Sequence, residues 1–377
     1  MKRFHNLDFL RSFAMIMGLF IHAHLLYIIP DVAKDFEIEN IAQPEGWVMI
    51  ITDFISNWRM PLFFLLSGFF SVLVIERKGA SYFIKDRIIR IGLTCLLFSA
   101  FYDILDGNFD FTTTHLWFLY ELMIFVLSFF LLYKVKIIKD IMCSTIPTKV
   151  FFVISLWLIA TVPLAHILNN SLHPLAINPS ETYFDLKPGN LVYYFSYFLI
   201  GVSLYSNQRI FNILAENKTI SVLAILSVLA FFLKLYVGSL TFGEVEDFRS
   251  LILTQFEPNM VLLNAFSKGI NTVLWCLFFI GFASKFIKSS SAILRWFVEL
   301  SYPVYIVHVV PLVIVSTIFY HAGLSQIRSF LLTIIIGFII CVILYYVFIK
   351  FTPLNWLMNG YHKSFLKLKL TRGDDNV

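Results

Sequence analysis

An arginine and a histidine share the first long apolar stretch of the chain, which runs from Phe9 to Ile29. Arg11 and His22 lie eleven positions apart, and at about 100° per residue this spacing puts both side chains on one helix face. Charged and ionisable side chains are costly in hydrocarbon and persist there mainly when they face a cavity or a partner. We therefore expect this face to line a reaction chamber.

The chemistry open to His22 is proton transfer, because a neutral imidazole can take a proton from a hydroxyl near neutral pH. The alternative is a histidine that is hydrogen-bonded between helices. His24 points to another side of the helix and is expected to be structural or interfacial. Asp8 lies three residues before Arg11, where it either orients that arginine or caps the helix.

A second arginine at membrane depth, Arg59, precedes Pro61 and the small pair Ser67-Gly68. An arginine this far from the end of an apolar stretch can extend only partly to the interface, so a functional role is favoured over a packing role. Pro61 frees a backbone carbonyl and is expected to bend the helix, and Gly68 permits close helix approach. Asp53 falls on a different face and is a doubtful partner for Arg59.

Arg87 and Arg90 follow at helical spacing on adjacent turns. Two neighbouring guanidinium groups suit a phosphate or pyrophosphate. The alternative is an ordinary collar of basic residues at the cytoplasmic interface, which charge alone favours.

His115 and Trp117 come near the start of a later apolar stretch, where a tryptophan by default belongs to the interfacial aromatic belt. Glu121 lies deeper, and a lone carboxylate in a membrane is often paired or protonated. Arg59 and His22 are its candidate partners.

The last group of polar residues lies between Ser301 and His308. Tyr305 and His308 are three residues apart and share a helix face, with His308 near the middle of the apolar stretch. Pro303 is a normal residue near a helix start. A functional histidine and a Tyr–His hydrogen bond between helices are equally open.

The elements that must position these residues are membrane helices. The chain has 377 residues, is 59% hydrophobic and 14% charged, and has a mean hydropathy of +0.80, unlike soluble domains. A spanning helix needs about 20 mainly apolar residues. We predict an all-α polytopic membrane protein with about ten transmembrane helices: 9–29, 47–75, 87–105, 115–133, 150–168, 190–206, 219–237, 259–284, 299–320 and 327–350.

The distribution of lysine and arginine gives the orientation. Most of the 29 basic residues fall in loops on one side of these stretches, and by the positive-inside rule both termini are cytoplasmic. The net charge of +5 therefore indicates a collar facing anionic lipid and not a nucleic-acid site. The first apolar stretch lacks a cleavage signal and is expected to remain as a spanning helix. Residues 1–350 are predicted to form a single transmembrane domain, and 351–377 a basic cytoplasmic tail. The four scattered cysteines predict neither a disulfide nor a metal site.

The motifs, in this order, resemble the acyltransferase 3 family of integral membrane acyltransferases. Members carry an early Arg-x10-His, here Arg11 and His22, then an arginine with Phe-Phe-x-x-Ser-Gly, here Arg59 and 63–68. An Arg-x-x-Arg and a Ser-Tyr-Pro-x-Tyr-x-x-His follow, here 87–90 and 301–308. Each motif alone is weak, but four in order are specific. The segments 6–11 and 22–27 look most like the branch that includes glucan biosynthesis protein C.

The resemblance implies transfer of a succinyl or acetyl group from cytoplasmic acyl-CoA to a hydroxyl of a periplasmic, cell-surface or lipid-linked saccharide at the bacterial inner membrane. Osmoregulated glucan is one acceptor; lipopolysaccharide or exopolysaccharide is the alternative. Acyl-CoA would be a co-substrate, with no permanently bound cofactor, no metal and no nucleic acid. His22 would be the base or acyl relay, Arg11 would hold an oxygen near it, and either Arg11 or Arg59 would stabilise the oxyanion. The remaining roles would be CoA-phosphate binding by Arg87 and Arg90, and lining of the substrate chamber by Asp8, Ser67, His115, Trp117, Glu121, Tyr302, Tyr305 and His308.

A proton-coupled carrier or flippase is the rival class, since intramembrane arginine, histidine and glutamate also mark carriers. Carriers commonly contain inverted repeats and broken helices; the sequence has no obvious repeat and one clear break, at Pro61. The sequence leaves open direct transfer against an acyl-enzyme relay, the acyl group, the acceptor and the oligomeric state, a homo-oligomer included. The outer loops 169–189 and 238–257, which should select the acceptor, contain no interpretable motif.

Overall fold

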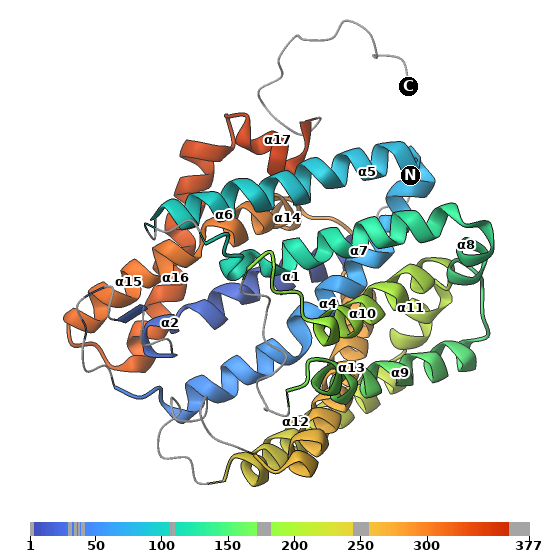
Figure 1. The fold of residues 1–377 in the computed structure, drawn as a ribbon, viewed down its shortest axis with the longest axis horizontal. Coiled ribbons are helices and arrows are strands. Elements are labelled where there is room, and N and C mark those ends of the chain that lie inside the picture. Colours follow the sequence, from blue (N-terminus) through green and yellow to red (C-terminus); the bar gives the residue numbers. More distant parts are fainter. Residues whose placement is uncertain are drawn as a thin grey trace, which may run out of the picture.

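The structure is a computed structural model that describes residues 4–28, 32, 33, 36, 38, 42–105, 107, 110–171, 182–243 and 256–361. Within these ranges the regular structure is helical (Figure 1), apart from one isolated β-bridge between Thr112 and Thr182. The helices are α1 (His5–His22), α2 (Leu25–Ile28), α4 (Gly46–Lys78), α5 (Ala80–Arg87), the π-helical η1 (Ile88–Leu93), α6 (Thr94–Leu105), the short η2 (Thr114–Leu116), α7 (Trp117–Lys134), α8 (Lys136–Met142), α9 (Thr148–Leu168), α10 (Pro188–Ser206), α11 (Arg209–Leu214), α12 (Asn217–Phe242), α13 (Pro258–Phe286), α14 (Ala292–Val307), α15 (Val309–His321), α16 (Gln326–Leu344), η4 (Tyr345–Ile349) and α17 (Leu354–Asn359).

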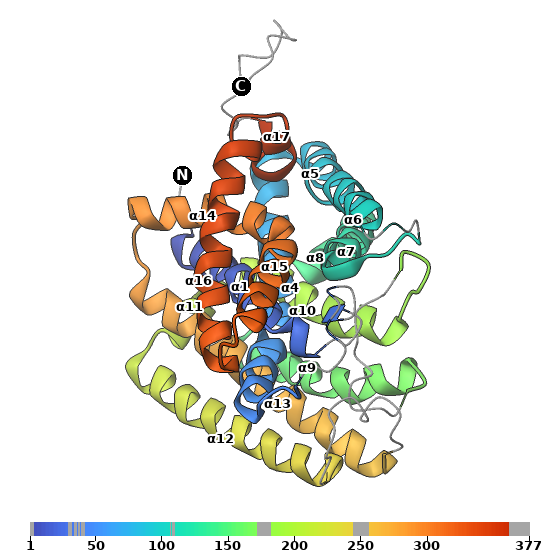
Figure 2. The same ribbon diagram turned by 90° about the vertical axis from the view of Figure 1, so that its left-hand side faces the viewer.

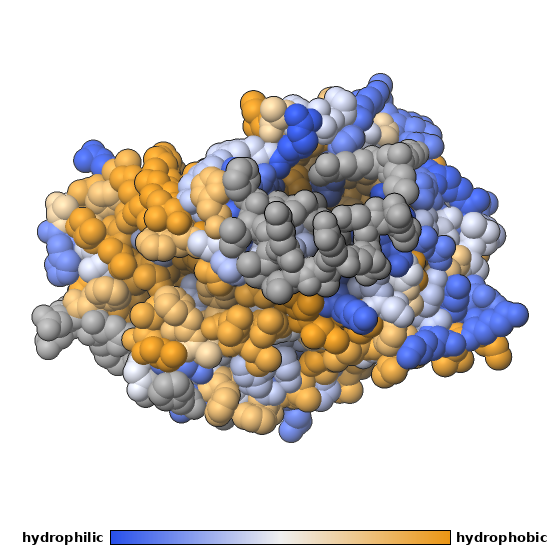
Figure 3. Space-filling view, turned by 90° about the horizontal axis from the view of Figure 1, so that it is seen from above, coloured by the Kyte–Doolittle hydropathy of each residue, from blue (hydrophilic) through white to orange (hydrophobic). Residues whose placement is uncertain are grey.

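The all-α, polytopic membrane architecture is confirmed. Among the described residues, 7 helices are long and apolar enough to span a membrane, or up to 8 if the bent pair α14–α15 counts as one span. The predicted spans 9–29 and 190–206 correspond to α1 and α10. These two helices are not among those long and apolar enough to span a membrane. The count of ten therefore stays a prediction. On the face shown in Figure 3, hydrophobic residues cover a large area, and hydrophilic residues gather toward one end.

Helices α4 and α10 pack closely against each other through two glycines. A Cβ atom on Gly68 would lie 1.9 Å from the carbonyl oxygen of Phe198, and one on Gly201 would lie 1.8 Å from the carbonyl oxygen of Leu65. The two backbones are thus in contact, as membrane helices with small interfacial residues allow. This confirms the role predicted for Gly68.

Pro61 does not interrupt α4, which continues through it as one helix of 33 residues. A proline lacks the N–H group that would bond the carbonyl four residues earlier, here that of Asn57. The Thr272 hydroxyl on α13 lies 3.0 Å from this carbonyl and 2.8 Å from the carbonyl of Lys268 on its own helix, so the two oxygens share its proton. The freed acceptor is therefore satisfied by a neighbouring helix, which is how membrane helices tolerate proline.

The break expected at Pro61 instead occurs at His308, inside the predicted span 299–320. Helices α14 and α15 meet there with a bend of 70°. Pro311 explains the position, because its ring conflicts with the carbonyl of Val307, four residues earlier, and ends the helix there. The prediction of one continuous span at 299–320 was wrong in this respect.

Helix ends that the basic residues assign to one side of the membrane meet in the structure. On the side predicted to be cytoplasmic, the Tyr133 hydroxyl at the end of α7 donates to Glu76 at the end of α4 (2.7 Å). On the opposite side, the Gln326 amide at the start of α16 donates to the carbonyl of Gln43 just before α4 (2.7 Å). These two contacts agree with the directions that the loops predict for α4, α7 and α16. The topology of the bundle and the assignment of each side stay predictions.

The packed structure continues past residue 350, where the tail was predicted to begin. Met358 in α17 is 0% exposed, and its carbonyl accepts bonds from Nε (3.2 Å) and Nη2 (2.9 Å) of Arg90. Figures 1 and 2 both place α17 near α5 at one edge of the bundle and α12 with α13 at the opposite edge. Residues 362–377 of the predicted tail lie outside the described residues.

Candidate active site

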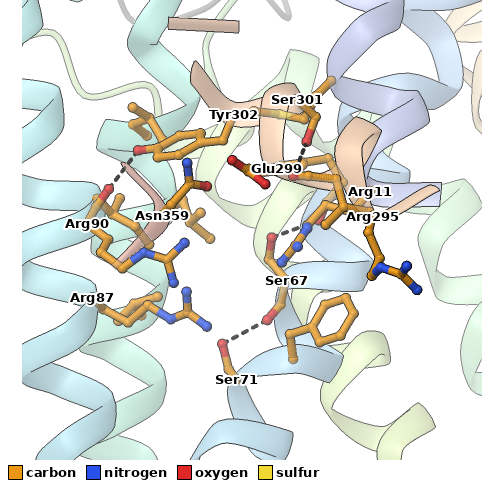
Figure 4. Close-up of a pocket in the computed structure, with 18 residues that line it drawn as sticks. Arg11, Ser67, Ser71, Arg87, Arg90, Arg295, Glu299, Ser301, Tyr302 and Asn359 are labelled. Carbon is orange, nitrogen blue, oxygen red and sulfur yellow. Dashed lines mark hydrogen bonds between the residues drawn. The ribbon is translucent and has the colours of Figure 1, made fainter. Parts of the chain in front are cut away.

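The principal cavity in the described part of the chain has a volume of about 370 Å³ and is lined by four arginines. We call it the arginine cavity (Figure 4). Its polar lining comprises Arg11, Ser67, Ser71, Arg87, Arg90, Arg295, Glu299, Ser301, Tyr302 and Asn359. Its apolar lining comprises Met15, Phe63, Phe70, Ile91, Leu119, Leu122, Val126 and Val298. The cavity thus combines a cationic region with apolar walls.

Arg87 and Arg90 project toward Ser67 and Ser71 across this cavity (Figure 4). Asp86 lies between the two guanidinium groups, at 3.9 Å from Arg87 and 3.7 Å from Arg90. Arg90 is also fixed by its bonds to Met358. The Nε atom of Arg87, in contrast, is buried without a hydrogen-bond partner among the described residues. Arg87 is therefore the arginine of this pair with unused donor capacity.

The π-helical segment η1 contains Arg90. Such segments are rare and often occur at functional sites. The backbone carbonyl of Arg90 accepts a bond from the Tyr302 hydroxyl at 2.6 Å, which joins this segment to α14. The structure thus unites the predicted Arg-x-x-Arg with Ser67 and Tyr302, two of the residues predicted to line the chamber.

Arg11 also lies in the arginine cavity, and this separates it from His22. The two residues are roughly 16 Å apart along α1 at about 1.5 Å per residue, and His22 is not part of the cavity lining. Arg11 pairs with Asp8 at 3.6 Å and lies over the Phe70 ring at 5.0 Å. The cavity thus contains Arg11 but not His22, and neither of these two contacts of Arg11 supports its predicted role beside His22, which stays a prediction. Asp8 orients Arg11; the helix cap is Phe4.

Arg295, the fourth arginine of the cavity, was counted in the sequence only as one of the basic loop residues. It lies at the fourth position of α14, where its Nη1 donates to Ser290 at 3.0 Å. Seven residues separate Arg295 from Tyr302, so two helical turns place both on one face. The spacing of seven positions between Arg295 and Tyr302 of the Ser-Tyr-Pro motif is the sequence feature that could have identified Arg295 as a site residue.

Three histidines from distant parts of the chain form a second polar group, which we call the histidine cluster. The ring centroids of His22 and His308 are 5.0 Å apart, those of His115 and His308 5.3 Å, and those of His22 and His115 6.3 Å. His22 ends α1, His115 lies in η2, and His308 occupies the break between α14 and α15. His115 and His308 are 8% and 0% exposed, so both side chains lie inside the protein.

Backbone carbonyls at the break orient two of these imidazoles. His308 Nδ1 lies 2.6 Å from the carbonyl oxygen of Tyr305, and His115 Nε2 lies 3.1 Å from that of Ile306. A carbonyl oxygen can only accept, so these nitrogens carry the protons. His308 Nε2 is then left with a lone pair, and it has no partner among the described residues. Such an atom can accept a proton from a substrate.

Arg59 supplies the cation of the histidine cluster. It is 5% exposed, and its guanidinium lies 5.6 Å from the ring centroid of Tyr305, which contacts His308 and His115. A Cβ on Gly18 of α1 would lie 2.6 Å from Arg59 Nη1, so this glycine makes room for the guanidinium. Its Nε and Nη1 are buried without partners in the described ranges. Arg59 does not extend to the interface.

One layer of aromatic rings separates the arginine cavity from the histidine cluster. Phe63 lines the cavity and packs edge-on against Phe118 at 5.4 Å. Phe118 contacts Tyr305 at 4.8 Å, and Tyr305 contacts His308 at 4.9 Å. We call Phe63, Phe118 and Tyr305 the aromatic layer. Ring contacts in series thus connect the arginine cavity to the histidine cluster.

Trp117 and Glu121 are buried on α7. Trp117 is 9% exposed and packs against Tyr194 at 5.5 Å, so it does not belong to an interfacial belt. Glu121 is 0% exposed, and neither carboxylate oxygen has a hydrogen-bond partner among the described residues. Its expected pairing with Arg59 or His22 is therefore not formed.

His24 takes the structural role predicted for it. Its Nε2 lies 2.5 Å from the Thr52 hydroxyl on α4, away from the cluster.

Comparison with known proteins gives a family match over most of the chain. A family model described as an acyltransferase domain matches residues 4–346. Glucans biosynthesis protein C of Escherichia coli O1:K1 is 32% identical over 95 residues, which are 25% of this chain and 23% of that protein. The same values hold for glucans biosynthesis protein C of E. coli O139:H28 (strain E24377A) and O9:H4 (strain HS). The match therefore spans less than a quarter of the curated relatives' length. No solved structure matches.

Proposed function

The chain belongs to the acyltransferase 3 family of multi-pass membrane acyltransferases, and we propose that it moves an acyl group from cytoplasmic acyl-CoA to a saccharide hydroxyl beyond the bacterial inner membrane. The main observation in support is the arrangement of the arginine cavity and the histidine cluster. The arginine cavity ends one aromatic layer away from three imidazoles and Arg59.

The arginine cavity has the chemistry to bind CoA. Guanidinium groups bind phosphate oxygens in bidentate fashion, and Arg87 has unused donor capacity. The cavity's apolar wall at Met15, Phe63 and Leu119 suits the less polar arm that carries the thioester. Arg11 and Arg295 would contribute to phosphate binding, because they line the same cavity.

The histidine cluster has the chemistry for the transfer itself. His22 would take the proton of the acceptor hydroxyl, whose oxygen attacks the thioester carbonyl carbon. Arg59, with two unpartnered donor atoms, would stabilise the negative charge on that carbonyl oxygen. The carbon–sulfur bond then breaks, and the proton passes from His22 to the CoA sulfur. His308 and His115 would hold His22 and the acceptor in place, and Tyr305 would admit the thioester past the aromatic layer.

The proposed acceptor and acyl donor rest on the names of the matched relatives and on the position of Arg59. A periplasmic glucan is the proposed acceptor because the matched relatives are named glucans biosynthesis protein C; lipopolysaccharide or exopolysaccharide is the alternative. Succinyl-CoA and acetyl-CoA both fit as donors. A succinyl carboxylate would require a cation near the histidine cluster, and Arg59 is the arginine placed there.

The test is CoA release by the purified protein in liposomes. Wild type, His22→Ala and the exposed-histidine control His321→Ala would receive acetyl- or succinyl-CoA, with periplasmic glucan or lipopolysaccharide as acceptor. We expect acceptor-dependent CoA release with one donor, its loss in His22→Ala and its retention in His321→Ala.

A folded protein that neither binds acyl-CoA nor releases CoA would contradict the proposal. The carrier alternative would then gain, because the break at His308 is a feature that carriers use at their binding sites.

A further inference from the structure

A group of ionisable residues on α4, α12 and α13 takes no part in the site described above. Lys234 is 8% exposed, and its ammonium forms an ion pair with the carboxylate of Asp53. The Asn57 amide lies 3.4 Å from the other oxygen of Asp53. Lys268 on α13 completes the group, which we call the lysine cluster (Asp53, Lys234 and Lys268). Buried charges at membrane depth are costly and mark functional sites by default.

The register of α4 against α13 brings Lys268 level with Asp53. The bond between Thr272 and the Asn57 carbonyl fixes these two residues side by side. Both helices start on the same side in the predicted topology, so one turn back along each leads from Asn57 to Asp53 and from Thr272 to Lys268. The three ionisable side chains thus form one group.

The lysine cluster has one positive charge in excess. Asp53 neutralises Lys234, and the half-buried Lys268 has no hydrogen-bond or ion-pair partner among the described residues. Asn271 lies one turn further along the same face of α13; it is 0% exposed, and both its amide nitrogen and its amide oxygen are unpartnered. Asn264, one turn on the other side, is 7% exposed with an unpartnered amide oxygen. Buried donors without partners are costly, and a ligand would relieve that cost.

The lysine cluster is separate from the arginine cavity. Asp53 lies seven residues from the start of α4, about 10 Å along the helix, on the side opposite to Arg87 and Arg90 in the predicted topology. Helices α12 and α13 also lie at the opposite edge of the bundle from α5 and α17 (Figures 1 and 2). A ligand of this cluster would therefore enter from the outer side.

We propose that the lysine cluster is a second anion-binding site, in which Lys268 and the Asn271 amide bind a phosphate ester or carboxylate. A strongly hydrated ammonium and an amide donor suit a single oxyanion group. The group would belong either to a water-soluble saccharide or to an anionic lipid. The site does not depend on acyl transfer, and its test requires no CoA.

The test is titration of inorganic phosphate into the full chain in nanodiscs of neutral phosphatidylcholine, followed by calorimetry. All proteins carry glutamine in place of the four arginines of the arginine cavity, Arg11, Arg87, Arg90 and Arg295, so that this cavity contributes little. We expect Lys268→Met to weaken phosphate binding at least about tenfold, and Lys268→Arg to retain it. Lys218→Met removes an exposed lysine on α12 and should leave binding unchanged.

Asn271→Leu is a second variant, expected to weaken phosphate binding while keeping the fold, since it replaces a buried unpartnered amide by an apolar group of similar size. Repeating the titration in nanodiscs with phosphatidylglycerol distinguishes the sources: competition by the lipid identifies a headgroup, and undiminished binding identifies a soluble anion. Equal phosphate affinity in Lys268→Met, Asn271→Leu and Lys218→Met, or no binding in the starting protein, would overturn the proposal.

Discussion

Arg11 and Arg59 are both arginines at membrane depth, but their surroundings assign them different tasks. Arg11 faces the arginine cavity beside Asp8, and Arg59 faces the histidine cluster over Tyr305. If the cavity binds CoA and the cluster performs the transfer, the two arginines should affect different kinetic constants. An interaction made throughout binding changes KM, whereas one made mainly in the transition state changes kcat.

We expect Arg11→Gln to raise KM for acyl-CoA about tenfold with little change in kcat, because it removes a charged ligand of the bound phosphates. Arg59→Gln should lower kcat about 100-fold or more, because it removes a donor to the developing oxyanion. Steady-state kinetics with the donor varied at saturating acceptor measures both.

The exposed Arg209 on α11 provides the control, and Arg209→Gln should leave both constants unchanged. A drop in kcat for Arg11→Gln as large as that for Arg59→Gln would contradict the separation of tasks.

At the scale of helices, a neighbouring helix supplies a hydrogen bond that α4 cannot make within itself. The hydroxyl of Thr272 satisfies the carbonyl that Pro61 leaves free on α4. Thr272→Val should therefore destabilise the protein by about 1 kcal/mol, the usual net value of one hydrogen bond. The thermal unfolding midpoint in detergent is the measurement.

Thr333→Val on α16 is the matched control for that experiment. Thr333 is 0% exposed, and its hydroxyl has no partner in the described ranges, so its removal should be neutral or stabilising. An equal loss of stability in both variants would mean that side-chain shape, and not the bond to Asn57, explains the effect.

Close contact between α4 and α10 gives a second prediction at this scale. Gly201→Ala would put a methyl group 1.8 Å from the carbonyl oxygen of Leu65, so the helices must separate, at a cost of about 2 kcal/mol or more. Gly238→Ala on α12 meets only the Phe242 ring at 3.9 Å and should be neutral or stabilising, since alanine favours helix. Unfolding midpoints of both variants decide this, and a stable Gly201→Ala would refute the close packing.

In the molecule as a whole, the aromatic layer connects the arginine cavity to the histidine cluster. The arginine cavity, the aromatic layer and the histidine cluster each draw residues from at least two distant segments. This order fits transfer from a cytoplasmic donor to an outer acceptor only if the arginine cavity opens to the cytoplasm. The orientation of the whole bundle is therefore the property on which the proposed direction of transfer depends.

Labelling of single cysteines tests the orientation. In a protein whose four native cysteines are replaced by serine, we expect Ser325→Cys, exposed just before α16, to react with a membrane-impermeant maleimide in spheroplasts. Lys218→Cys, exposed at the start of α12, should react only after the membrane is opened. The positive-inside rule predicts this pattern, and the reverse pattern would place the arginine cavity on the outer side.

The sequence by itself determined the features that depend on residues close together in the chain. Apolar stretches and loop charges were enough to predict a helical membrane protein, because spanning length and periodicity depend on neighbouring residues. Helical spacing likewise placed Tyr305 with His308, whose ring centroids are 4.9 Å apart, and gave Gly68 its interfacial role. The same local rules put the break at Pro61 and not near Pro311, since whether a proline breaks a membrane helix depends on whether another helix satisfies the freed carbonyl.

Only the tertiary structure decided which helix faces which. Spacing put Arg11 and His22 on one face, but the neighbours along that face differ: α5, η1 and α14 surround Arg11, whereas the break at His308 and η2 surround His22. The histidine cluster and the lysine cluster each join residues more than 30 positions apart, and no local pattern marks such pairs. Helix association in a membrane depends on close packing and interhelical hydrogen bonds, which are properties of the assembled bundle and not of any one segment.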